Sequence, residues 1–148
     1  MKITRSIWPA AAAAALAACA GVTSRVQSGK VQTTIDQKAE RGGQLEAIGI
    51  GASDPTLPSD TQRKALARDA AIVKAQYEML SMVKGVALQG GITVSRAIET
   101  DSSLETKILQ TIQGAEIVKS EFTADNGCVV TIRLPKRRLE ELMGVRFE

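Results

Sequence analysis

The chain of 148 residues contains no histidine, and this absence narrows the chemistry open to it. Histidine is the commonest general base, a frequent metal ligand and a member of most nucleophilic triads. Aromatic residues are also few: Trp8 lies near the start, and only Tyr77, Phe122 and Phe147 follow. Platforms that stack bases need more aromatic rings than this. These absences favour a protein with no catalytic residues, no metal and no cofactor.

Cysteine is scarce as well, with only Cys19 and Cys128. Cys128 lies in the alternating string "GCVVTIRL", which predicts a buried core thiol because free cysteine is among the most buried residue types. The alternative interpretation is a disulfide to another chain in an oxidising compartment.

The first residues have the layout of a secretory signal peptide. Lys2 and Arg5 precede an uncharged run from residue 7 to residue 18, which is far shorter than the roughly 20 residues of a membrane-spanning helix. The string "LAAC" at residues 16–19 resembles the lipobox of bacterial lipoproteins, in which one enzyme lipidates the cysteine thiol and a peptidase cuts the chain immediately before the cysteine. We expect a signal peptide over residues 1–18 and lipidation of Cys19. The alternative is a plain signal peptide in which Cys19 is incidental.

The formal charge of +3 falls towards neutral when Lys2 and Arg5 leave with the signal peptide, so it gives no argument for nucleic acid. Four basic residues nevertheless cluster near the C-terminus. They are candidate contacts for an anionic partner such as lipid headgroups or peptidoglycan: Arg133, Lys136, Arg137 and Arg138. A solvated charge run, balanced by Glu140 and Glu141, is the alternative interpretation.

Residues 19–43 are polar and without a sustained period, so they predict a flexible tether ahead of one globular domain over residues 44–148. The domain opens on "LEAIGIGAS", a strand with small residues on one side. Gly49 and Gly51 match a phosphate-binding loop only weakly. We instead expect these glycines to let a helix pack closely on the strand.

A long helix is predicted from Ser59 to Gly85. Its apolar residues recur at spacings of 4, 3, 4 and 3: Leu66, Ala70, Val73, Tyr77 and Leu80. We predict that this stripe faces the core, with a groove for a partner as the alternative. Residues 86–98 predict a long strand, residues 102–114 a helix, and residues 115–124 and 127–134 a hairpin around Asn126-Gly127. A final helix follows Pro135 and ends at Gly144.

These elements predict a single α+β domain in the order β-α-β-α-β-β-α, with a mostly antiparallel sheet and the long helix packed across it. The strings "LEAIGIGAS", "ALARDAAIVKAQYEMLSMVKGV" and "IQGAEIVKSEF" resemble the LPP-twenty family of small outer-membrane lipoproteins. Relatives in that family include the FlgP-type flagellar lipoprotein, which builds a ring under the outer membrane. The resemblance implies a non-enzymatic structural subunit and transfers no active-site residue.

Three hypotheses follow. The first is an envelope structural or assembly subunit, self-associating and flagellum-associated, anchored in outer-membrane lipid at the periplasmic face through Cys19. The second is a periplasmic binding module that regulates cell-wall enzymes or holds peptidoglycan through residues 133–138. The third is an enzyme using Asp69 and Glu78, which lie 9 positions apart and therefore on opposite faces of the helix. We favour the first, with no small-molecule substrate.

Overall fold

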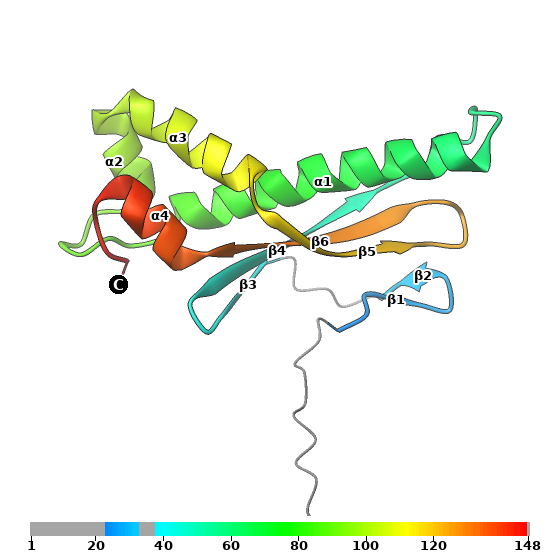
Figure 1. Ribbon diagram of the computed structural model, residues 1–148, viewed down its shortest axis with the longest axis horizontal. Helices are drawn as coiled ribbons and strands as arrows, with labels where there is room; N and C mark the ends of the chain where they lie inside the picture. The colour runs from blue at the N-terminus through cyan, green and yellow to red at the C-terminus, as the bar shows by residue number, and fades with distance from the viewer. Residues whose placement is uncertain (1–22, 33–37, 148) are drawn as a thin grey trace, which may run out of the picture.

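The computed structural model describes residues 23–32 and 38–147, which form one α+β domain and confirm the predicted fold class (Figure 1). The chain order is β1 (Val26–Gln27), β2 (Lys30–Val31), β3 (Lys38–Arg41), β4 (Gln44–Gly51), α1 (Asp60–Lys84), α2 (Val94–Thr100), α3 (Ser102–Gln113), β5 (Glu116–Phe122), β6 (Cys128–Pro135) and α4 (Lys136–Met143). The first strand of the predicted domain, the long helix, the helix after residue 102, the hairpin and the last helix all form where the sequence places them.

The main sheet has the order β3-β4-β6-β5 and is antiparallel throughout. Its two central strands align Ala47 with Ile132 and Gly49 with Val130, so both rows of small and apolar side chains lie on one face. Helix α1 covers that face, and the β1–β2 hairpin lies on the other side of the sheet (Figure 1). The core therefore fills the layer between α1 and the two central strands.

Helix α1 approaches β4 so closely that only glycine fits beneath it. A Cβ added to Gly49 would lie 1.9 Å from the carbonyl oxygen of Ala71, and one on Gly51 would lie 2.0 Å from that of Ala67. The facing helix residues Ala67 and Ala71 are fully buried, as is Ala75 one turn further on. The predicted role of the two glycines in helix packing is confirmed.

The predicted core face of α1 is wrong. Leu66, Val73 and Tyr77 are 48%, 65% and 64% exposed, whereas the row of buried alanines described above and Met79 face the sheet. The glycines of β4 leave room only for small side chains, so the alanine row turns inward and the bulkier stripe turns outward. Glu78, predicted on the solvent side, is buried, and its carboxylate lies 2.8 Å from the Lys74 ammonium.

The predicted strand over residues 86–98 is also wrong. Gly90 and Gly91 have φ angles of +108° and +77°, and the chain reverses there so that the Leu88 amide donates to the Ile92 carbonyl at 2.8 Å. The Thr93 hydroxyl then accepts from the Arg96 amide and begins α2. Alternating apolar residues produced the strand pattern, but two left-handed glycines favour a turn.

The predicted tether over residues 19–43 is corrected wherever the structure describes it; residues 19–22 and 33–37 lie outside the described part. Strand β3 pairs with β4 over residues 38–41. The β1–β2 hairpin contacts the turn of the β5–β6 hairpin, where the Ala124 amide donates to the Gly29 carbonyl at 2.8 Å. Backbone hydrogen bonds hold β3 at the edge of the sheet, so its polar residues form a strand although their sequence shows no alternation of apolar and polar residues.

The N-terminal segment is also held by Glu121 of β5. Its carboxylate accepts from the Ser24 hydroxyl and, at 2.7 Å, from the Arg25 amide. Burial raises the pKa of Glu121, but these hydrogen bonds and the Lys119 charge outweigh it and hold the pKa below the ordinary value of 4.5.

We expect the contact between residues 23–32 and the sheet to loosen as the solution is acidified below about pH 4.5. A carboxyl with a lowered folded-state pKa stabilises the fold above its unfolded pKa, and this contribution is lost as the pH falls through the folded value. The chemical shift of the Arg25 amide, followed by NMR against pH, measures the effect. In Glu121→Gln, which keeps an acceptor oxygen but does not titrate, the shift should stay constant; equal titration in both proteins would contradict the prediction.

Candidate functional site

The predicted lipidation site, Cys19, lies outside the described residues, which begin at Thr23. Within residues 23–32 and 38–147, no helix is both apolar enough and long enough to cross a membrane. The structural evidence on function therefore comes from the surfaces of the domain.

The four basic residues predicted to contact an anionic partner do not converge on one site. Arg133 lies on the sheet face away from α1, and its Nη2 is 2.6 Å from Oε1 of Glu46 on the neighbouring strand. The Lys136 ammonium lies 2.5 Å from Oε1 of Glu40 in β3. Both cations are therefore neutralised by acids that are distant in the sequence.

The remaining two basic residues lie on α4 and also have partners within the chain. Arg137 Nε is 3.3 Å from Oε1 of Glu141, although both side chains are largely exposed. Arg138 donates from Nη1 to the Gly114 carbonyl at 3.2 Å, which ties α4 to the end of α3. Arg137 is therefore far more accessible to a partner than Arg133 or Lys136.

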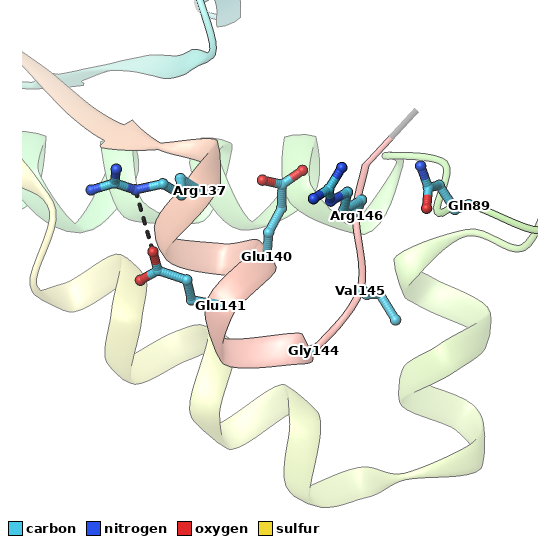
Figure 2. A pocket seen from close by; sticks show the side chains of 7 residues that line it. All are labelled: Gln89, Arg137, Glu140, Glu141, Gly144, Val145 and Arg146. Carbon is cyan, nitrogen blue, oxygen red and sulfur yellow. Dashed lines mark ion pairs between the residues drawn. The ribbon is translucent and has the colours of Figure 1, made fainter.

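Arg137 borders a surface hollow of about 820 Å³ between α4 and the loop after α1 (Figure 2). The residues that line it are Gln89, Arg137, Glu140, Glu141, Gly144, Val145 and Arg146. In Figure 2 the Arg137 side chain extends away from that of Arg146, so the two guanidinium groups do not share a target. Glu140 accepts from the Phe147 amide at 3.0 Å and so fixes the C-terminal segment. Two arginines against two glutamates leave the hollow without a strong preference for anions.

The groups weighed as catalytic are placed apart. Asp69 is exposed on α1, whereas Glu78 is buried and paired with Lys74, so the two carboxyls lie on opposite faces as the sequence predicts. Cys128 is 1% exposed between α1 and the sheet, and burial raises the pKa of its thiol. Its predicted place in the core is confirmed, and a buried neutral thiol is a poor nucleophile and a poor partner for an interchain disulfide. No group of three potential metal ligands occurs among the described residues.

The surface that sequence reasoning placed wrongly is the exposed face of α1. Leu66, Ala70, Val73 and Tyr77 form a row along the helix on the side away from the sheet, and we call these four residues the α1 stripe. Large apolar side chains that share one exposed face commonly mark an interaction surface. The pairing of Gly49 and Gly51 with the alanine row was the pattern in the sequence that could have revealed this orientation.

Comparison of the chain with protein-family models, with curated proteins and with solved structures found no match.

Proposed function

We propose that this chain is a non-enzymatic lipoprotein, anchored through acylated Cys19 in the outer membrane at its periplasmic face, and that it serves as a self-associating structural or assembly subunit of the envelope. The observation that carries this proposal is the order of Lys2, Arg5, the short apolar run and the "LAAC" string. A lipoprotein cysteine with two or three acyl chains is held firmly, whereas one chain alone binds a membrane only marginally.

Features of the domain support a structural role. The chain has no histidine, and its two candidate acids lie on opposite faces of α1, where they cannot act as an acid–base pair on one substrate. The α1 stripe gives the domain an exposed apolar surface suited to another protein. The resemblance to the LPP-twenty family, which extends to flagellar lipoproteins, agrees with a subunit of an envelope assembly.

The alternative function, a binding module for peptidoglycan or cell-wall enzymes, receives less support. It depends on Arg133, Lys136, Arg137 and Arg138 acting together, yet three of them are paired with acids and the fourth binds a carbonyl. To bind these four side chains, an anionic polymer would have to displace a separate intramolecular partner from each of them.

Replacing Cys19 with alanine is expected to abolish acylation and to remove the protein completely from the outer-membrane fraction. Attachment of the lipid requires the thiol of Cys19, which alanine lacks, and the thiol of the other cysteine, Cys128, is buried in the core. Metabolic labelling with a fatty acid, membrane fractionation and mass spectrometry of the N-terminal peptide measure the result. Cys128→Ala is the matched control, because it removes the buried thiol and should leave labelling unchanged. Normal labelling and location of the Cys19→Ala protein would contradict the proposal.

A further inference from the structure

The α1 stripe has the spacing of a helix–helix seam. Leu66, Ala70, Val73 and Tyr77 are separated by 4, 3 and 4 positions, and half-buried Leu80, which also packs against the core, follows after 3 more. An average spacing of 3.5 residues is the repeat by which two α-helices pack knobs into holes. On this helix the seam faces outward, because the alanine row on the other side already occupies the sheet.

We propose that the occupant of this seam is α1 of a second copy of the chain, packed parallel to the first. The inference rests on the proposed self-association and assigns it a surface. Apolar side chains of moderate size, with alanine at the centre, suit a symmetric pair of helices better than a deep pocket on a different protein.

The charges that flank the seam favour a parallel pair. Asp69 precedes one seam position and Lys74 follows the next, so the two lie five positions apart on opposite sides of the stripe. In a parallel two-stranded coiled coil these are the g and e positions that meet across the interface. Asp69 of one copy then faces the partner's Lys74, and the symmetry of the pair makes this contact twice. The Lys74 ammonium, half-exposed and bound to Glu78, has three hydrogens and so can bind a second carboxylate.

The seam is short, so the pairing is expected to depend on confinement. From Leu66 to Tyr77 the helix advances about 16 Å, and a contact of that length buries less than the roughly 800 Å² per partner typical of stable complexes. Anchoring in a membrane raises the effective concentration of neighbouring copies, as a linker does for two tethered modules. The test is therefore performed on the full chain in membranes.

Leu66→Cys and Tyr77→Cys, introduced separately, distinguish the two orientations. Parallel pairing places each new cysteine beside its own counterpart, so each variant alone should give a disulfide-linked dimer when isolated outer membranes are oxidised. Antiparallel pairing separates identical residues by about 16 Å, beyond the roughly 7 Å limit between the Cα atoms of a disulfide, and links the two variants only when they are mixed. Thr106→Cys, exposed on α3, is the control for random collisions, and the unmodified chain is the control for native cysteines.

Dimer bands from Leu66→Cys and Tyr77→Cys, absent for Thr106→Cys, support the proposal. Asp69→Lys should then lower the linked fraction about two- to five-fold, and adding Lys74→Asp should restore it. Equal linking of all three variants, linking only in the mixture, or linking to a protein of different mass would overturn it. A native gel of the unmodified protein distinguishes failure of this surface from failure of self-association itself. An oligomer that shows no linking at Leu66 refutes the α1 stripe as the interface, whereas a monomer refutes self-association as well.

Discussion

Gly49→Ala is expected to destabilise the domain by at least about 3 kcal/mol, because the new methyl group would overlap backbone that cannot move independently. Its Cβ would lie 1.9 Å from the Ala71 carbonyl oxygen and 2.4 Å from the Ala75 amide nitrogen. Both atoms belong to the hydrogen-bonded interior of α1, so relief requires the helix to lift from the sheet. That would open the contact between α1 and the two central strands. Urea unfolding followed by circular dichroism measures the loss, which is a large share of a typical total of about 5–15 kcal/mol.

Gly85→Ala is the matched control for this prediction. Gly85 ends α1 with a φ of −84°, a conformation that alanine adopts readily, and the nearest atom to an added Cβ is 3.5 Å away. We expect the free energy of unfolding to stay unchanged or to rise by up to about 1 kcal/mol. A similar loss in both variants would show that glycine at residue 49 is not required for space.

Met79→Ala is expected to cost about 3 kcal/mol of stability. The Met79 side chain has no exposed surface, and it fills the core between α1 and the sheet where the glycines no longer lie beneath the helix. Truncation removes buried apolar contact and leaves a cavity that the paired central strands cannot collapse to fill. The same urea titration measures the change.

Tyr77→Ala, two residues away on the same helix, tests the orientation of α1 directly. Tyr77 is 64% exposed, and we expect its truncation to change the free energy of unfolding of the monomer by no more than about 0.5 kcal/mol. The amphipathic pattern of the sequence instead predicts that Tyr77 faces the core, where its truncation would be costly. A larger loss for Tyr77→Ala than for Met79→Ala would restore that pattern and contradict the structure.

The sequence predicted the fold class and most element positions because the relevant information is local. Asn126 adopts a φ of +65° in the turn between β5 and β6, and Gly144 ends α4 at +67°, as short-range turn and capping preferences require. The face of α1 could not be read locally, since both sides of the helix carry apolar residues. The choice between them was made by Gly49 and Gly51, on a different element.

The candidate site was predictable only in part, for a similar reason. The "LAAC" string is a local motif, so Cys19 stands as a prediction from the sequence alone. The basic residues looked like one cluster because they are neighbours in the sequence. Arg133 binds Glu46, 87 positions away, and Arg138 binds the carbonyl of Gly114, 24 positions away, so the fold disperses them. Contacts between residues so far apart in the sequence cannot be predicted from amino-acid composition or from the spacing of apolar residues.

The docking of the N-terminal hairpin on the sheet limits how far the domain can move from its proposed lipid anchor. With lipid on Cys19 as proposed, Arg25, whose amide is fixed on the sheet, follows the acylated residue by only six positions. Six residues reach at most about 20 Å, against about 85 Å for the 25 residues from Cys19 to the start of β4. The domain then works within a narrow radius of the bilayer surface. Whatever it assembles with must come to the membrane to meet it.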